Sequence, residues 1–216
     1  MNVIYIGSGR SALQAKKLDL TNFNIICLNN AWRLLDNFDV WIRPGDFPSK
    51  DMPKKINFKK EVSYSEYSYH IKKLSKELNW QTNSPEHYVG YTMFFQGLYY
   101  IMSAIKPKNI YTLGFDHDYN IDRYNHWKNI GEPNPQNQFL NINIEKEFDR
   151  FEADSFYGKS STPDPLRRGL GFDYLKDKFE LAKKISKDLN INLYNASFQT
   201  KGVNLFKRAN LVSLHK

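Results

Sequence analysis

A glycine-rich turn near the start of the chain carries residue types that can bind a phosphate. It consists of Gly7, Ser8, Gly9, Arg10 and Ser11. Small residues let a backbone approach a phosphate closely, and the first N–H groups of a following helix attract anions. The dinucleotide motif GxGxxG is incomplete, because its third glycine position holds Ala12 and no acidic residue directly follows the second apolar run. The turn therefore predicts either a phosphate or nucleotide site or a purely structural turn.

A second cluster gathers carboxylates and an imidazole after another apolar run. Its members are Gly114, Phe115, Asp116, His117 and Asp118, and His126 follows shortly after. We expect catalysis or nucleotide recognition here rather than metal binding, because no second cluster with ligand spacing accompanies it. His126, near Asp116 and Asp118, can act as a general base toward a sugar hydroxyl, since imidazole titrates near neutral pH. The alternative is a structural histidine in an aromatic loop.

Two further polar groups follow apolar runs. Asn29 and Asn30 offer amide donors and acceptors that suit ribose hydroxyls or a base edge, or one of them caps a helix. Arg43 can hold a phosphate through paired hydrogen bonds, and Gly45 lies in the same turn. The alternative for Arg43 is an ion pair with Asp46 that shapes the turn. Both groups are candidate nucleotide ligands.

All these candidates follow short apolar runs that are typical of strands. The runs span residues 2–6, 25–28, 39–42, 109–113 and 191–194. Patterns typical of helices lie between them, at residues 11–17, 66–80, 94–105 and 175–189. Continuously apolar strands alternating with helices predict a doubly wound, mainly parallel, Rossmann-like α/β sheet. Ligands of such sheets bind beyond the carboxyl ends of the strands, where the candidates lie.

The length of 216 residues suits one domain, so we expect residues 1–216 to form a single α/β domain. Residues 119–171 differ in being polar, aromatic and interrupted by prolines. They predict a lid or acceptor-binding insert, with a helix at about residues 145–156.

Composition narrows the class of protein. With 41% hydrophobic and 15% aromatic residues, the chain is too apolar to be disordered. The net charge of +8 favours nucleotides, phosphorylated glycans, an anionic membrane surface or nucleic acid as partners, although solvated lysines explain it equally well. The single cysteine, Cys27, excludes a disulfide within the chain. Because no signal segment and no apolar run of about 20 residues is present, we expect a cytoplasmic protein without a transmembrane segment.

The order of these segments resembles, over most of the chain, the small bacterial sialyltransferases of glycosyltransferase family 42. It also resembles the related MptE-like proteins, formerly grouped as a domain of unknown function. Residues 6–11 are similar to the family's opening G-N-G-P-S turn, and Asn29 or Asn30 falls at its nucleotide-binding asparagine. Residues 40–45 resemble its third strand and N-P-G turn.

Three later segments continue the resemblance. Thr92 falls at the family's T-S-G segment, which heads a helix. Residues 111–116 resemble its strand ending in S-G-I-D, and residues 193–197, with Asn195 and Ser197, resemble its final strand and loop.

The resemblance implies a sheet of the GT-A-variant type and a metal-independent glycosyltransferase. Such an enzyme moves a sugar from a nucleotide-sugar, such as CMP-sialic acid, to a hydroxyl acceptor on a glycan; the donor is a substrate, and no cofactor is implied. The implied nucleotide-sugar site comprises Gly7, Ser8, Gly9, Arg10, Ser11, Asn29, Asn30, Arg43, Gly45, Thr92, Gly114, Phe115, His117, Asn195 and Ser197. The family's asparagine is replaced here by Arg43, and its catalytic histidine has no counterpart at residues 170–174. The base is therefore His126, Asp118 or Asp173.

Other activities stay open beside this one. The MptE-like resemblance implies pyrophosphate transfer from ATP to a pterin alcohol, which requires Mg²⁺. DNA with hydroxylated bases is another acceptor that fits the net charge of +8. A nucleotide-binding module without catalysis, a homo-oligomer and peripheral contact with an anionic surface complete the alternatives.

Overall fold

The computed structural model describes residues 1–49, 52–53, 57–79, 89, 92–116, 171–197 and 204–211. The predicted insert at residues 119–171 falls outside this part of the chain except for residue 171, and so do His117, Asp118 and His126. The expectation of a single domain likewise stays a prediction.

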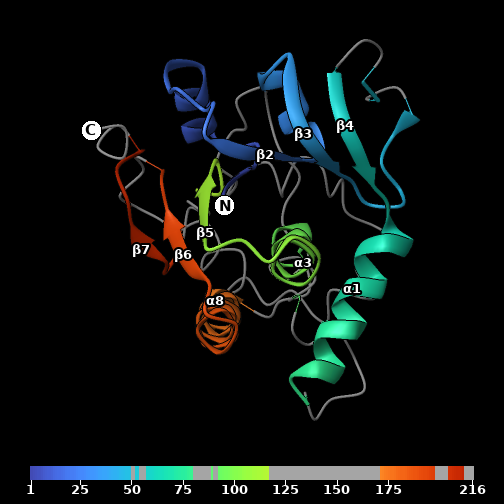
Figure 1. The fold of residues 1–216 in the computed structure, drawn as a ribbon, viewed down its shortest axis with the longest axis vertical. Helices are drawn as coiled ribbons and strands as arrows, with labels where there is room; N and C mark the ends of the chain where they lie inside the picture. Colours follow the sequence, from blue (N-terminus) through green and yellow to red (C-terminus); the bar gives the residue numbers. More distant parts are fainter. Residues whose placement is uncertain are drawn as a thin grey trace, which may run out of the picture.

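Within the described residues, seven parallel strands form one sheet in the order β4-β3-β2-β1-β5-β6-β7 (Figure 1). The strands are β1 (Asn2–Ile6), β2 (Phe23–Leu28), β3 (Asn37–Ile42), β4 (Asn57–Val62), β5 (Asn109–Leu113), β6 (Asn192–Asn195) and β7 (Lys207–Arg208). β1 lies between β2 and β5, with Ile6 opposite Cys27 on one side and Leu113 on the other. The predicted doubly wound, parallel sheet is confirmed.

Residues 3–6 of β1 are all apolar because the sheet is covered on both faces. Val3 and Tyr5 belong to one hydrophobic core, and Ile4 and Ile6 belong to the other. Successive side chains of a strand point to opposite faces, so an unbroken apolar run fills both cores at once.

α-Helices cover one face of the sheet, and 3₁₀ segments cover the other (Figure 1). The helices are α1 (Tyr64–Glu77), α3 (Met93–Tyr100) and α8 (Gly171–Asp188). The 3₁₀ segments are η1 (Arg10–Lys17) and η2 (Asn29–Leu34), and a π-helical turn, η4 (Ile101–Ile105), continues α3. The predicted helices at 66–80, 94–105 and 175–189 are thus confirmed in place, whereas residues 11–17 form a 3₁₀ segment rather than an α-helix.

α3 lies close against the sheet because a glycine faces a tyrosine. The Tyr5 hydroxyl donates to the carbonyl oxygen of Phe94 at 3.2 Å. A Cβ added at Gly97 would overlap the Tyr5 hydroxyl oxygen. This close approach fixes the start of α3 beside the carboxyl end of β1.

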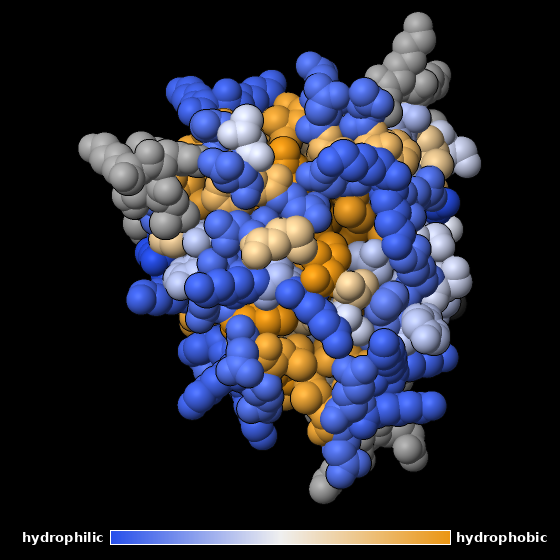
Figure 2. Space-filling view, viewed as in Figure 1, coloured by the Kyte–Doolittle hydropathy of each residue, from blue (hydrophilic) through white to orange (hydrophobic). Residues whose placement is uncertain are grey.

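Among the described residues, no helix is both long enough and apolar enough to cross a membrane. Figure 2 shows hydrophilic side chains over α1 and α8, with hydrophobic side chains visible between them. The cytoplasmic location stays a prediction.

Candidate functional site

The candidate site lies where the winding of the sheet changes direction. The chain builds outward from β1 to β4, then returns to place β5 on the other side of β1. The point between β1 and β5 is therefore a topological switch point, where α/β sheets commonly bind ligands beyond their carboxyl ends. The glycine turn follows β1 at this point, and the segment Gly114 to Asp116 follows β5.

The two segments are joined directly through their backbones. The N–H of Gly7 donates to the carbonyl oxygen of Leu113 at 2.8 Å, and that of Gly9 donates to Gly114 at 2.7 Å. Gly114 has a φ of 74°, which favours glycine, and a Cβ there would come within 2.6 Å of the Ala12 Cβ. Segments more than a hundred positions apart thus share one edge of the sheet.

Asp116 holds the glycine turn through Ser11. Its carboxylate accepts the Ser11 backbone N–H at 3.0 Å and a short hydrogen bond from the Ser11 hydroxyl. Asp116 is only 6% exposed, and a Cβ at Gly9 would lie 2.6 Å from its Oδ2. A carboxylate of the protein itself therefore takes the Ser11 N–H, and the glycines permit its close approach.

The Ser11 hydroxyl also links the turn to the ends of β5 and β6. Its oxygen accepts the N–H of Gly114 at 3.0 Å and lies 2.8 Å from Ser197 Oγ. Asn195 Oδ1 accepts the N–H of Ser197 at 3.0 Å, and both residues are buried. Hydrogen bonds therefore join one group of predicted site residues: Gly9, Ser11, Gly114, Asp116, Asn195 and Ser197.

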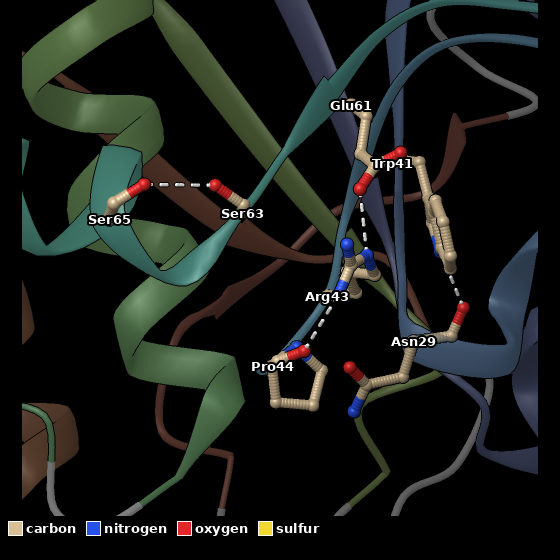
Figure 3. A network of polar contacts seen from close by, with 7 residues as sticks. All are labelled: Asn29, Trp41, Arg43, Pro44, Glu61, Ser63 and Ser65. Carbon is tan, nitrogen blue, oxygen red and sulfur yellow. Dashed lines mark hydrogen bonds and ion pairs between the residues drawn. The ribbon is translucent and has the colours of Figure 1, made fainter. Parts of the chain in front are cut away.

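The two asparagines after β2 differ in their surroundings. Asn30 Oδ1 accepts a hydrogen bond from Arg33 Nε at 3.1 Å. Asn29 has a φ of 50°, its carbonyl oxygen accepts the Trp41 indole N–H at 2.9 Å, and its side chain points toward Pro44 (Figure 3). Asn29 Oδ1 is buried, and none of the described residues donates to it. Of the pair, Asn29 is the one with an unused buried acceptor.

Arg43 pairs with a different carboxylate from the one expected, and its role toward a phosphate stays a prediction. Its Nε contacts Glu61 on β4 at 2.7 Å, and its Nη1 contacts the Pro44 carbonyl oxygen at 3.4 Å (Figure 3). Its guanidinium also lies 5.8 Å from the centroid of the Trp41 ring. The expected ion pair with Asp46 is replaced by one with Glu61. At Gly45 a Cβ would meet its nearest neighbour at an ordinary 3.6 Å, so the described packing does not require glycine there.

Thr92 and Phe115 have structural contacts in addition to their predicted roles. Thr92 Oγ1 accepts the N–H of Phe95 at 3.4 Å and so caps α3. The Phe115 ring is buried against Tyr5 and Phe94, at centroid distances of 4.5 and 4.6 Å. These contacts lie below the carboxyl ends of the strands. A nucleotide-binding role for either residue stays a prediction.

The described residues include no group of three or more histidines, cysteines or acidic residues that could hold a metal ion. His117, Asp118 and His126 lie outside the described part of the chain, so the expectation of metal independence stays untested. Asp173 lies in the first turn of α8, where its exposed carboxylate pairs with Lys176 at 3.0 Å.

A cavity of about 530 Å³ lies elsewhere, at the end of the sheet where the strands begin. Its lining comes from the amino ends of β2, β3 and β4 and includes Phe23, Phe38 and Phe58. It therefore lies apart from the switch point, and the residues that we single out do not line it.

Two further buried or hydrogen-bonded residues were not predicted from the sequence. Asn204 Nδ2 donates to the carbonyl oxygen of Phe115 at 3.3 Å. Lys178 is buried within α8, at 4% exposure. A signal for Lys178 exists in the sequence, because it falls between Leu175 and Ala182 on the apolar stripe of the helix; Asn204 has none.

No protein-family model and no curated protein matches the chain. Among solved structures, it is similar to the sialyltransferase CstII from Campylobacter jejuni in complex with a substrate analogue, cytidine-5'-monophosphate. The identity is 14%, the match covers 97% of this chain and 86% of that chain, and the TM-score is 0.45. A likeness this distant carries no conclusion about what this chain binds or does.

Proposed function

We propose that the protein is a glycosyltransferase that binds a nucleotide-sugar at the carboxyl edge of the sheet, between β1 and β5. The observation that carries the nucleotide site is the convergence of the Gly7–Ser11 turn, the Gly114–Asp116 segment and Ser197 at the switch point. The transfer of a sugar, from a CMP-sugar in particular, rests on the resemblance of the ordered motifs to family 42.

The nucleoside half of the donor would bind near Asn29. A buried amide oxygen without a donor is costly, and a ribose hydroxyl or an exocyclic amine of a base would supply that donor. Asn30, which already accepts from Arg33, would play the lesser part.

The phosphate would lie over the glycine turn. The N–H groups of Gly7, Gly9 and Ser11 donate to protein acceptors, so the phosphate would use those of Ser8 and Arg10. Asp116 would then serve as a positioning residue that holds the turn, while the base is a different group.

In the proposed reaction, a base takes the proton of the acceptor hydroxyl, whose oxygen forms a bond to the anomeric carbon of the sugar. The bond from that carbon to the phosphate oxygen breaks, and the nucleotide leaves with the electron pair. We propose His126 as the base, with Asp118 and Asp173 as rivals. The segment at 119–171 would close over the donor and exclude the water that would otherwise hydrolyse it.

A thermal-shift panel of CMP, UMP, UDP, GDP and ATP tests the donor class, because a ligand that binds only the folded state raises Tm. We expect CMP to give the largest shift and CMP-sugar turnover to survive a metal chelator. A preference for ATP, with turnover that requires Mg²⁺, would instead support pyrophosphate transfer. Retention on DNA at low salt, lost steeply as salt rises, would favour a DNA acceptor.

Two asparagines of β2 and its following turn provide a matched pair for the same assay. Asn29→Ala should weaken CMP binding at least several-fold, whereas Asn24→Ala should leave it unchanged. Asn24 also has a buried side-chain oxygen to which none of the described residues donates, but it lies toward the amino end of the strand. Equal effects of the two substitutions would count against a nucleoside site at Asn29.

His126→Ala tests the base. It should abolish transfer while CMP affinity stays within about twofold of the unsubstituted protein. Retained turnover would shift the assignment to Asp118 or Asp173, which the matching asparagine variants separate.

A further inference from the structure

Lys178 is a buried cation in the middle of the apolar stripe of α8. Its exposure is 4%, and it lies beside Leu175 and Phe179, which are fully buried. Its ammonium lies 4.5 Å from the centroid of the Tyr174 ring, one helical turn earlier. In the described part of the chain, no carboxylate forms an ion pair with it. A single aromatic ring compensates only a fraction of the free energy needed to bury a charge. The ammonium therefore lacks the anionic partner that a buried charge requires.

The helix that carries Lys178 packs against aromatic residues that precede the candidate site. α8 leads into β6, a parallel strand, so the amino end of the helix lies toward the carboxyl edge of the sheet. The ring of Phe179, the next residue, lies 5.4 Å from that of Phe94 at the start of α3. Phe94 in turn lies 4.6 Å from Phe115, which precedes Asp116. Lys178 therefore lies in a helix that packs on the same face of the sheet as Phe94 and Phe115.

We propose that the Lys178 ammonium forms an ion pair with the phosphate of the bound nucleotide. This inference rests on the nucleotide site proposed above and adds to it the residue that would neutralise the phosphate charge. An anion is the partner that a buried, unpaired ammonium requires, and the phosphate is the anionic group that the turn after β1 would bring to this edge.

The effect of burial on the lysine agrees with this assignment. Burial lowers the pKa of Lys178, and the neighbouring carboxylate of Asp177 opposes that effect. Burial thus makes the charged form less favourable than it is in water, and a bound phosphate would offset that cost.

Calorimetric titration of CMP and of cytidine separates the phosphate from the nucleoside. Lys178→Met keeps the length and apolar stem of the side chain and removes the charge. We expect it to weaken CMP binding at least tenfold and to change cytidine binding by less than twofold. Lys178→Arg should retain most of the CMP affinity. Lys176→Met, which removes an exposed lysine of the same helix, is the matched control and should bind both ligands normally.

Each outcome decides between the two proposals. If the unsubstituted protein binds CMP and Lys178→Met binds it equally well, the role of Lys178 is refuted while the nucleotide site stands. If the unsubstituted protein binds no nucleotide of the panel, the nucleotide site and the role of Lys178 both fail. Inorganic phosphate is titrated in parallel, and a tenfold loss confined to it, without loss for CMP, would also refute the proposal.

A second measurement does not depend on the folding of Lys178→Met. In the unsubstituted protein, the lysine side chains are observed by NMR after isotopic labelling, with Lys178→Arg used to identify the Lys178 signal. CMP should raise the pKa of Lys178 toward that of an ordinary lysine, whereas cytidine should not. An unchanged Lys178 titration at saturating CMP would overturn the inference.

Discussion

The carboxylate of Asp116 accepts hydrogen bonds from both the backbone N–H and the hydroxyl of Ser11, which lies 105 positions earlier in the chain. This pairing joins the turn after β1 to the turn after β5, and the close approach of Asp116 explains the glycine at position 9. A ligand bound at the switch point would depend on this pair to hold the two turns in place.

Asp116→Asn should destabilise the fold. An amide offers one acceptor oxygen where the carboxylate offers two, so one of the two Ser11 donors loses its partner. We expect a loss of about 1–3 kcal/mol in the free energy of unfolding, measured by urea denaturation. Asp173→Asn, which alters an exposed ion pair, should change it by less than about 0.5 kcal/mol. An unchanged midpoint for Asp116→Asn would show that the buried pair contributes little.

Gly97→Ala should push α3 away from the sheet, because the new Cβ would overlap the Tyr5 hydroxyl. Overpacking of this kind costs about 1–3 kcal/mol. In a Tyr5→Phe background the cost should be smaller, since the nearest atom is gone, although Cζ remains 2.9 Å from the added Cβ. A double-mutant cycle by urea denaturation measures the coupling, and additive effects would contradict the proposed contact.

Replacing glycine with alanine should lower stability at Gly114 but not at Gly45. Gly114→Ala should cost more than about 1 kcal/mol, because the backbone φ is positive and the Cβ would meet Ala12. Gly45→Ala should change stability by less than about 0.5 kcal/mol, because space is available. If Gly45 serves the nucleotide, its variant should lose CMP affinity while Tm without ligand stays the same; unchanged affinity would remove Gly45 from the site.

Cys27 should be inert in the native protein. Its side chain is fully buried in β2, and burial raises the pKa of its thiol well above the usual range. A thiol reagent at neutral pH should therefore report no reactive thiol until denaturant is added, when one appears per chain. Rapid labelling without denaturant would mean that β2 opens readily.

His70 should titrate below the ordinary histidine value of about 6.5. Burial lowers the pKa of His70, the positive charges of Lys73 and Lys60 lower it further, and Glu66 opposes them. As the pH falls through 6.5, the unfolded state binds the proton first, so stability decreases until the pH reaches the pKa of the folded state. NMR titration gives that pKa directly, and His70→Gln should remove this part of the pH dependence. A measured pKa above 6.5 would reverse the sign.

The sheet could be predicted because its inner strands are continuously apolar. β1 and β5 occupy the predicted residues, since strands buried on both faces have a clear local signature. β4 was missed because it lies at the edge, where Lys59 and Lys60 are exposed and break the apolar run. Edge strands need fewer apolar side chains, so their sequence resembles that of a loop.

The location of the site followed from the topology, but its internal contacts did not. A parallel sheet gathers its carboxyl ends, so the convergence of the two glycine segments could be anticipated. The pairing of Ser11 with Asp116, and of Arg43 with Glu61, depends on distant residues that no local pattern connects. Lys178 was overlooked because a lysine in a helix is ordinarily solvated.

The layers that cover the two faces of the sheet should differ in local stability. The glycine turn leads directly into η1, a 3₁₀ segment, whereas α3 and α8 bury long apolar stripes on the other face. Hydrogen bonds in 3₁₀ segments are less favourable than those of α-helices. Amide protons of η1 should therefore exchange with solvent sooner than those of α3, and the proposed nucleotide should slow the exchange of η1 when it binds.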